Sequence, residues 1–237
     1  MRIKVEKTGV IEKLMNFNLS RQEALVYVCL WEHGKLTGYE ASKLTGISRS
    51  NVYGALNVLA DKGAAVITET NNTLYSAVDP REFLENKIRH MEEDKKYLVE
   101  HMPKAVKCEE GYITIQGYRN IKDKIRNMIK QCDMRLYLAA NGNIIKEYED
   151  ILLETKQRGL KIVIISDRDY SHLATRFYQN QSEEGQIRLI TDSTYVLTGE
   201  LKQDVGDTCL YSGQKNLVTI MKEALRNKIR LLEMEEA

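Results

Sequence analysis

The sequence contains little proline or cysteine, which argues against a disulfide-rich scaffold and against long disordered segments. Two prolines and four cysteines occur among 237 residues, and no low-complexity tract is present. The cysteines lie far apart, without a Cys-x-x-Cys pair or a histidine at metal-ligand spacing. We therefore expect neither a metal nor a cofactor. Buried, reduced thiols are expected, with a redox role left open, at Cys29, Cys108, Cys132 and Cys209.

Long hydrophobic runs and an excess of one charge are also missing. No apolar run approaches the length that spans a bilayer, and the N-terminus lacks the apolar core of a signal peptide. We expect a cytoplasmic protein without a membrane partner. The 35 basic and 34 acidic residues nearly cancel, so any binding to DNA must come from locally placed side chains. A chain of 237 residues is long enough for two domains with separate cores.

Residues 48–63 predict an amphipathic helix with one face left free. Its apolar side chains recur at positions i, i+3, i+4 and i+7, namely Val52, Ala55, Leu56 and Leu59. Ser48 is the expected N-cap, and Gly63 tolerates a left-handed φ just past the helix end. The free face carries Arg49 and Asn57, side-chain types that bond base edges at two points. Other polar residues suit phosphates or flanking bases: Ser48, Ser50, Asn51 and Tyr53.

The free face of this helix is also compatible with simple solvation, so the preceding segments decide its interpretation. Ser20 and Glu23 have the spacing of a capping box, which begins a helix over residues 20–33. The apolar residues of that helix include Ala24, Leu25, Val28 and Cys29. Thr37 and Glu40 repeat the capping box for a short helix that stops at Gly46. Two helices joined by a tight turn with glycine predict a helix-turn-helix, whose second helix enters the major groove.

A β-hairpin is predicted directly after the second of these helices. Residues 64–69 and 73–78 are β-prone, and the asparagines between them favour a turn. The order of three helices and a hairpin is that of a winged helix-turn-helix. The phosphate contacts expected from the wing are Asn71, Asn72 and Thr73.

A longer helix follows, with Asp79 as N-cap and Pro80 at its first position. Its apolar residues follow the a/d spacing of a coiled coil, with the predicted dimerisation seam formed by Leu84, Ile88, Met91, Leu98 and Met102. Lys95 interrupts the seam, and Pro103 ends or kinks the helix. We expect a homodimer, which sets two recognition helices about 34 Å apart on a palindromic site. The alternative is a linker helix packed on its own chain.

From residue 111 onward the pattern alternates between strands and helices. The predicted strands cover residues 112–116, 135–139, 160–165, 187–190, 195–198 and 208–211, and the predicted helices cover residues 120–132, 143–158, 170–180 and 216–234. Asp192, Ser193 and Thr194 are expected to form a hairpin turn. We predict an α+β and α/β protein of two domains. The winged helix-turn-helix covers residues 1–79, the helical dimerisation linker residues 80–107, and an α/β domain with a mixed sheet residues 108–237.

The N-terminal motifs resemble those of the TrmB family of transcriptional regulators. The resemblance rests on the run from Leu19 to Ala24, the run from Ser48 to Tyr53, and Asp79-Pro80 before a coiled coil, and it covers residues 10–107 closely. The remainder resembles, more loosely, the phospholipase D-like domain of that family. The resemblance implies a dimeric transcription factor with an effector-sensing C-terminal part. The best-known members bind sugars with a further β-rich domain, and this chain ends before one, so sugar sensing is not carried over.

Phospholipase D chemistry needs a His-x-Lys-x-x-x-x-Asp motif, in which histidine attacks phosphorus and lysine holds the phosphate oxygens. With Asp192 at the final position, Gly185 and Ile187 stand where histidine and lysine are required. His172 has no lysine two residues later. We therefore expect a domain that binds a ligand or partner and is not an enzyme.

Polar residues follow two predicted strands at the ends where α/β proteins often bind ligands. The candidate effector-binding residues are Asn141, Asn143, Ser166, Asp167 and Arg168. Turns and helix caps use the same residue types for local reasons, and no glycine-rich phosphate loop is present.

The sequence thus predicts a dimeric regulator that binds double-stranded DNA and responds to an unknown small-molecule or protein effector. Two alternatives remain. The first is a phosphodiesterase or nuclease targeted to DNA by its winged helix. The second is a protein-interaction module whose winged helix binds another protein.

Overall fold

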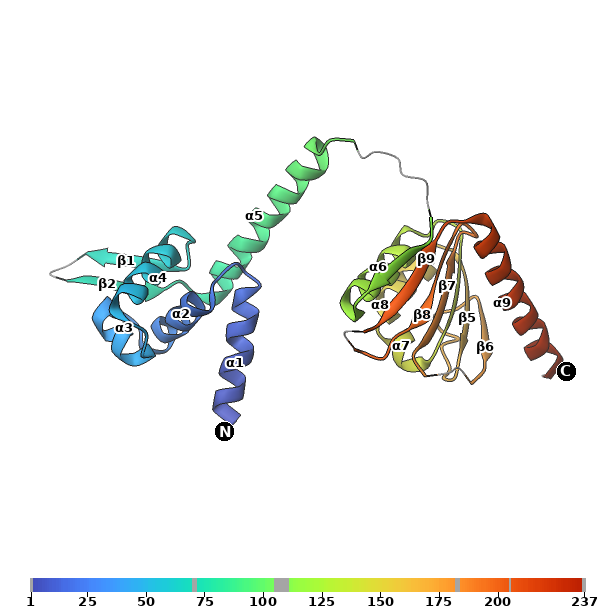
Figure 1. The fold of residues 1–237 in the computed structure, drawn as a ribbon, viewed down its shortest axis with the longest axis horizontal. Helices are drawn as coiled ribbons and strands as arrows, with labels where there is room; N and C mark the ends of the chain where they lie inside the picture. The colour runs from blue at the N-terminus through green and yellow to red at the C-terminus, as the bar shows by residue number, and fades with distance from the viewer. Residues whose placement is uncertain (1, 70–71, 105–110, 182–183, 205, 236–237) are drawn as a thin grey trace. The chain divides into compact units, whose positions relative to one another are not determined.

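The computed structural model describes the whole chain except residues 1, 70–71, 105–110, 182–183, 205 and 236–237 (Figure 1). The chain divides into two compact units, residues 1–105 and residues 106–237, here called unit 1 and unit 2. Each unit has its own hydrophobic core, as the length of the chain allows. No helix in the described ranges is long and apolar enough to cross a membrane.

Unit 1 has the predicted order of three helices, a hairpin and a long helix, preceded by one further helix. Its elements are α1 (Arg2–Met15), α2 (Arg21–His33), α3 (Gly38–Thr45), α4 (Arg49–Asp61), β1 (Ala65–Glu69), β2 (Thr73–Ala77) and α5 (Pro80–His101). Both predicted capping boxes are confirmed. The Ser20 and Thr37 hydroxyls accept the backbone N–H groups of Glu23 and Glu40, whose carboxylates accept in return. Gly46 takes the left-handed conformation that ends α3.

The apolar stripe of α4 forms the centre of the unit 1 core. Val52, Leu56 and Leu59 are fully buried, and Ala55 is 7% exposed. The face predicted for α2 is partly wrong, because Leu25 is 40% exposed and Val28 is half-buried. The helix instead buries Ala24, Val26, Tyr27, Cys29 and Leu30. α2 packs against α1, α3, α4 and β2, so its buried surface is wider than one amphipathic stripe.

The first turn of α2 is tied to the last residues of α4 by a half-buried ion pair. Lys62 Nζ lies 2.7 Å from the Glu23 carboxylate and 2.6 Å from the backbone oxygen of Asn18. Partial burial raises the pKa of Glu23, but hydrogen bonds from Lys62 and Ser20 outweigh this and lower the pKa below 4.5. Lys62 therefore fixes the packing of the helices and points away from the free face of α4.

The long helix α5 begins and ends as the sequence predicts. The Asp79 carboxylate accepts the backbone N–H of Arg81 at 2.8 Å, and the helix ends at His101, before Pro103. Phe83 is buried, and Leu84 packs against the unit 1 core. Beyond Leu84 the seam residues are 48–66% exposed, and they are Ile88, Met91, Leu98 and Met102.

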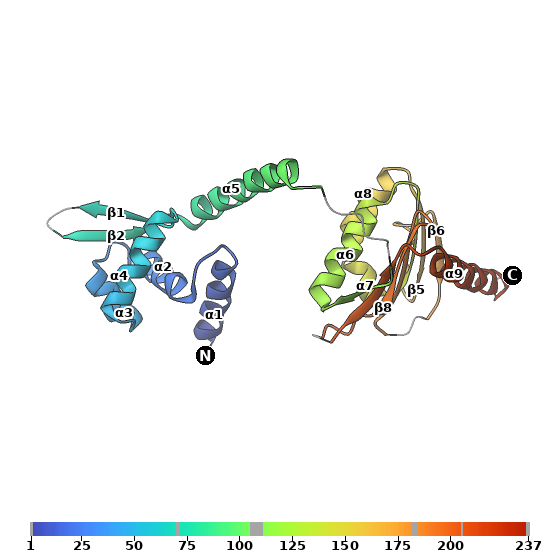
Figure 2. The same cartoon turned by 45° about the horizontal axis from the view of Figure 1, so that its top comes forward.

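Unit 2 is built on one mixed sheet of seven described strands, in the order β3-β9-β8-β7-β4-β5-β6 (Figures 1 and 2). Its elements are β3 (Ile113–Gln116), α6 (Tyr118–Gln131), β4 (Arg135–Ala140), α7 (Gly142–Lys146), α8 (Glu149–Gln157), β5 (Lys161–Ser166), β6 (Arg176–Gln179), β7 (Gln186–Thr191), β8 (Tyr195–Glu200), β9 (Thr208–Ser212) and α9 (Lys215–Glu235). β4, β5 and β6 run parallel, and the other pairings are antiparallel. The predicted mixed sheet is confirmed.

Helices cover both faces of this sheet, so alternate residues of each central strand enter different cores. On β4, Leu136 and Leu138 pack with α6 and α8, while Tyr137 packs with α9. On β5, Ile162 and Val163 divide in the same way. Figures 1 and 2 show α6, α7 and α8 on one face and α9 on the other.

Two predictions for unit 2 are wrong in detail. The helix predicted over residues 170–180 is a turn followed by the strand β6. In the turn, the Asp169 carboxylate accepts the backbone N–H of Ser171 at 2.8 Å, and this local bond competes with helix formation. Phe177 and Tyr178 then favour a strand, paired in parallel with β5. The single helix predicted over residues 143–158 is divided into α7 and α8.

Asp192 begins the predicted turn between β7 and β8, and its carboxylate has a structural use. The φ angle of Asp192 is +51°, and its carboxylate accepts the backbone N–H groups of Asp133, Met134 and Arg135 at 2.7–3.0 Å. The thiol of Cys132 also donates to it. Burial raises the pKa of Asp192, but these hydrogen bonds lower it by a larger amount, so the pKa lies below its usual value. The residue that we aligned with the catalytic aspartate therefore anchors the start of β4.

The Glu23 interactions predict a specific loss of stability in acid. Because the folded-state pKa of Glu23 lies below 4.5, its stabilising contribution is complete above the unfolded value and is lost as pH falls through the folded value. We expect the free energy of unfolding of unit 1 to fall less between about pH 7 and about pH 3.5 in Glu23→Gln than in the wild type. Urea unfolding followed by the fluorescence of Trp31, which lies in unit 1, measures this. Glu12→Gln, an exposed site on α1, is the control, and equal acid sensitivity in all three proteins would contradict the assignment.

The two buried cysteines of unit 2 should react slowly. Burial, followed by the nearby Asp192 carboxylate, raises the pKa of Cys132 to about 11, and burial next to Asp207 raises the pKa of Cys209 to about 11. Since the thiolate is the reactive form, alkylation by iodoacetamide at about pH 8 should be slowed by at least about 100-fold relative to the urea-unfolded protein. Mass spectrometry of digested peptides gives both rates. Equal rates in the folded and unfolded protein would show that these thiols are accessible. The predicted Cys108 lies outside the described residues.

Candidate nucleic-acid interface

Five of the six residues predicted to contact DNA lie on α4, and Ser48 lies directly before its first residue. Each of Ser48, Arg49, Ser50, Asn51, Tyr53 and Asn57 is exposed. At 100° per residue, Arg49, Ser50, Tyr53 and Asn57 project within about 100° of one another, whereas Asn51 projects from a different side. The geometry therefore favours the first four as one contact face and leaves Asn51 at its flank.

Ser48 occupies the predicted N-cap position, but its side chain does not cap the helix. Its hydroxyl lies 3.3 Å from the Ser50 hydroxyl. The first-turn N–H groups of α4 thus have no cap from Ser48, and they belong to exposed residues beside two hydroxyl groups. A helix start of this kind favours phosphate oxygens through N–H donors and the positive end of the helix dipole.

Arg49 is held in place by an aromatic contact that the sequence does not reveal. Its guanidinium lies 4.2 Å from the ring centroid of Tyr39, on α3, and Lys43 Nζ lies 4.7 Å from the same ring. Tyr39 remains 40% exposed. The ring restricts the position of the Arg49 side chain while leaving its N–H donors accessible. An exposed tyrosine at the start of α3, four residues before a lysine, was the available signal for this cluster.

Tyr53 joins this surface because α3 begins with glycine. A Cβ atom at Gly38 would lie 2.5 Å from Cε1 of the Tyr53 ring, so the ring occupies the space that a larger residue would fill. Tyr53 remains 43% exposed, with its ring between the start of α3 and α4. Tyr39, Lys43, Arg49, Ser50 and Tyr53 together form a polar and aromatic surface at the α3–α4 junction.

The wing is the predicted antiparallel hairpin, and β2 is hydrogen-bonded to the segment before α3. β1 and β2 pair from Ala65 opposite Ala77 to Glu69 opposite Thr73. Leu36 pairs with the middle of β2 by exchanging two backbone hydrogen bonds of 2.8–2.9 Å with Tyr75. Asn72 and Thr73 are exposed near the tip, and Asn71 lies outside the described residues.

An apolar hollow of about 880 Å³ lies between α1, α2 and the start of α5. Its walls include Val10, Phe17, Trp31 and Leu84, the last of which begins the α5 seam. Val10 and Trp31 are 49% and 51% exposed. The hollow therefore adjoins the apolar residues of the predicted dimerisation helix.

The predicted effector residues of unit 2 are brought together in part. The Asp167 carboxylate accepts the backbone N–H of Gly142 at 2.6 Å and the hydroxyl of the buried Ser166 at 3.2 Å. The Asn141 side chain caps α7 by accepting the N–H of Ile144. The loops after β4 and β5 are thus joined by their own polar groups, and the Arg168 side chain lies against Gly142.

The two asparagines among these residues line a hollow with a volume of about 430 Å³. Asn141 and Asn143 share it with Tyr118, whose hydroxyl donates to Glu147 at 2.7 Å. Burial and this hydrogen bond raise the pKa of Tyr118 to about 12. No group of three His, Cys, Asp or Glu side chains within the described residues has metal-binding geometry.

Fold and surface together define a winged-helix domain joined to an α/β domain. Residues 14–81, which span most of the winged helix, match the family described as "Sugar-specific transcriptional regulator TrmB". The uncharacterized protein YrhO of Bacillus subtilis (strain 168) is 26% identical over 183 residues, 75% of this chain and 66% of that protein. The HTH-type sugar sensing transcriptional regulator TrmBL1 of Pyrococcus furiosus is 28% identical over 221 residues, 86% of this chain and 63% of that protein. The chain thus matches slightly less than two thirds of the length of each relative.

Two solved structures are similar in outline. TrmBL2, described as an archaeal chromatin protein with a novel mode of DNA binding, is 20% identical and has a TM-score of 0.45. The match covers 95% of this chain and 98% of that one. Nuc from Salmonella typhimurium, a phospholipase D family member, is 12% identical with a TM-score of 0.42, over 52% of this chain and 95% of that one.

Proposed function

We propose that this protein is a transcriptional regulator that binds specific sites in double-stranded DNA through unit 1. The observation that carries the proposal is the exposed polar face of α4, presented by a helix whose opposite face is buried in the core. Arg49 and Asn57 read base edges in the major groove, while Ser48, Ser50, Asn51 and Tyr53 contact phosphates or flanking bases. Asn71, Asn72 and Thr73 of the wing contact the neighbouring phosphates. Such a protein acts in the cytoplasm.

The TrmB-family match and the regulator names of the relatives support this proposal. A near-neutral charge means that affinity depends on a small number of placed cations, such as Lys43 and Arg49 beside Tyr39. Fixing these cations before binding lowers the entropy lost when DNA binds. A protein-interaction module would not need side chains suited to base edges on its exposed helix.

The regulator acts as a homodimer paired through α5. Its seam residues Ile88, Met91, Leu98 and Met102 are 48–66% exposed at coiled-coil spacing, and Leu84 continues the seam toward the apolar hollow. Pairing of two copies would bury this surface and place two α4 helices on successive major grooves.

Unit 2 serves as an effector domain and not as a phosphodiesterase. Gly185 and Ile187 stand where a histidine nucleophile and a phosphate-binding lysine are required. The Asp192 carboxylate is engaged by three backbone N–H groups and a thiol. The relatives named as transcriptional regulators agree with a role other than catalysis.

Arg49→Ala should weaken binding to a DNA duplex selected from random sequences by about 1–3 kcal/mol, roughly 5- to 150-fold, because it removes a base contact. Arg49→Lys should recover only part of the affinity, since lysine keeps the charge and loses the two-point geometry. Fluorescence anisotropy at two salt concentrations measures both effects.

Arg21→Ala is the matched control for this test. Arg21 is exposed and begins α2, beside the Glu23–Lys62 ion pair at the far end of α4 from Arg49. Its removal should leave the selectivity for the selected duplex unchanged. Equal affinity of the wild type and Arg49→Ala would contradict the role of Arg49. A DNA affinity that is absent or independent of salt would favour the protein-interaction alternative.

Ile88→Asp combined with Met91→Asp should convert the dimer to a monomer, because it places charge in the centre of the paired seam. Light scattering of the full chain gives the mass. Tyr97→Asp is the control, since Tyr97 is 62% exposed on the same helix but lies off the seam. A dimer that survives the double change would assign the pairing to another surface.

A further inference from the structure

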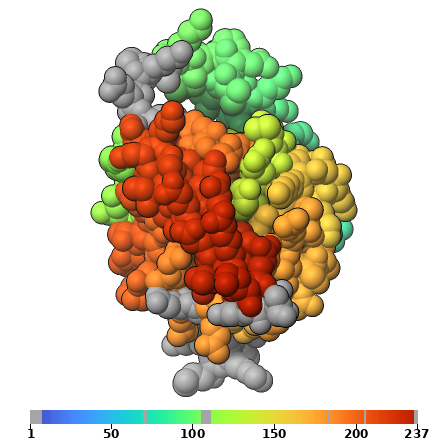
Figure 3. Space-filling model, turned by 90° about the vertical axis from the view of Figure 1, so that its right-hand side faces the viewer, coloured from blue at the N-terminus to red at the C-terminus, as the bar shows by residue number. Residues whose placement is uncertain are grey.

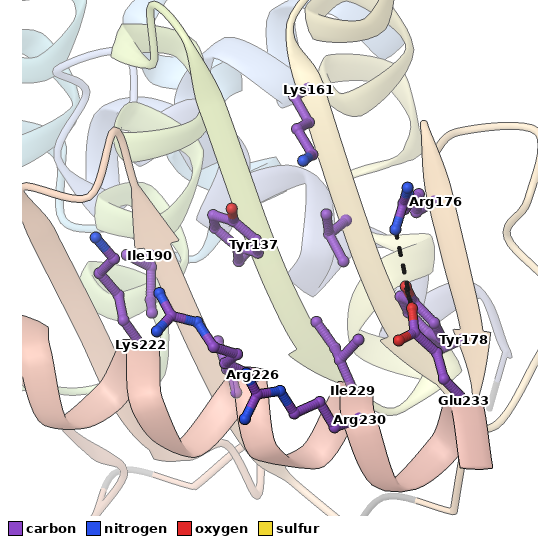
Figure 4. A pocket seen from close by; sticks show the side chains of 12 residues that line it. Tyr137, Lys161, Arg176, Tyr178, Ile190, Lys222, Arg226, Ile229, Arg230 and Glu233 are labelled. Carbon is purple, nitrogen blue, oxygen red and sulfur yellow. Dashed lines mark hydrogen bonds and ion pairs between the residues drawn. The ribbon is translucent and has the colours of Figure 1, made fainter. Parts of the chain in front are cut away.

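Unit 2 contains a basin that lies away from the strand ends where a ligand was predicted. It has a volume of about 350 Å³ and lies between α9 and the sheet, over β7, β4, β5 and β6 (Figure 4). Four of its residues are cross-strand neighbours in one row, Ile190, Tyr137, Val163 and Arg176. Figure 3 looks onto the face that α9 crosses. The row and the helix define two walls of one site.

The basin is strongly basic. Its cationic side chains come from two strands and the helix, and they are Lys161, Arg176, Lys222, Arg226 and Arg230. Glu233 is the one carboxylate among the described lining residues, and it accepts the Tyr178 hydroxyl at 2.7 Å and lies 3.8 Å from Arg176. The remaining cations have no ion pair within the described part of the chain. A concave surface with this charge attracts an anion.

The spacing of the helical cations argues against a purely structural role. Lys222, Arg226 and Arg230 follow one another at four-residue intervals, and like charges at this spacing destabilise a helix. None of them lies in the last turn, where the helix dipole would favour a cation. A local feature that opposes stability is typical of a functional site.

The other lining residues favour an organic anion over a simple ion. The Tyr137 and Tyr178 rings lie on the same face of the sheet, on β4 and β6 with β5 between them. The apolar side chains of Val163, Ile190, Leu225 and Ile229 also line the basin. Aromatic rings and an apolar floor bind a planar group, while guanidinium groups bind phosphate oxygens at two points. The volume is within the range of small-molecule sites. An extended DNA backbone has no planar group to place here while its bases remain stacked.

We propose that this basin binds a nucleoside phosphate, with the phosphate on Arg226 and Arg230 and the base beside the tyrosine rings. Lys161, Arg176 and Lys222 supply further positive charge around the phosphate. A nucleoside phosphate would be the effector that unit 2 senses. Its effect on DNA binding rests on the proposed function. Binding itself is a property of unit 2.

Titration calorimetry of the full chain with adenosine 5′-monophosphate tests the site. We expect saturable binding of one molecule per chain, with adenosine and inorganic phosphate each at least about tenfold weaker, because each lacks one half of the recognised group. Arg226→Ala combined with Arg230→Ala should weaken binding at least about tenfold. The Tm of this variant is measured beside its binding, so that a folding defect would be recognised.

Lys215→Ala combined with Lys228→Ala is the matched control, because it removes two cations of α9 that do not line the basin. It should leave binding of adenosine 5′-monophosphate unchanged. Three outcomes would overturn the inference: no saturable binding, equal losses in the two double variants, or inorganic phosphate binding as tightly as the nucleotide. Weaker DNA binding in the Arg226/Arg230 variant without nucleotide binding would assign the basin to DNA and also overturn it. If the wild-type protein binds DNA but not the nucleotide, only the nucleotide site is rejected. If it binds the nucleotide but not DNA, only the proposed DNA-binding function is rejected.

Discussion

Burial of the α4 stripe is the constraint on which the DNA-binding surface depends. Val52, Leu56 and Leu59 are fully buried, so rotation of α4 about its axis would expose apolar side chains at a cost of about 1.5–3 kcal/mol each. The Glu23–Lys62 ion pair and the Leu36–Tyr75 bridge fix the two neighbours of this helix, α2 and the wing. The face that carries Arg49 and Tyr53 is therefore set by the core behind it.

Unit 2 uses packing differently, because both faces of its sheet are covered. The face toward α6 and α8 is filled by aliphatic side chains from neighbouring strands. The face toward α9 is covered by a single helix, which leaves room at the start of β5 and β6. A single covering helix explains why one face holds a basin.

Much of unit 1 could be predicted because its signals are local. Capping residues, a helical apolar stripe and a hairpin turn each depend on a few neighbouring residues, and the predicted elements agree with the structure. The contact of Arg49 with Tyr39 could not be predicted, because it depends on the packing of α3 against α4. The position of Ser48 predicts a side-chain cap for α4, but its hydroxyl lies 3.3 Å from the Ser50 hydroxyl instead.

Unit 2 was less predictable because its structure depends more on contacts between residues that are distant in the sequence. The side-chain turn at Asp169 and the strand pairing of β6 outweigh the helical pattern of residues 170–180. The basin brings Lys161 and Arg176 close to side chains of α9, which is distant from them in the sequence. No local sequence motif could therefore predict the basin. The polar loops after β4 and β5, where a ligand was predicted, are instead hydrogen-bonded to each other, because the Asp167 carboxylate accepts the backbone N–H of Gly142.

Hydrogen exchange of the full chain, measured with and without its selected DNA duplex, tests whether α4 and the wing bind DNA. We expect slower amide exchange at the start of α4, near Arg49 and Ser50, and in the described strands of the wing, with α9 unchanged. Protection confined to α9 or to the sheet of unit 2, with exchange in α4 unchanged, would contradict it.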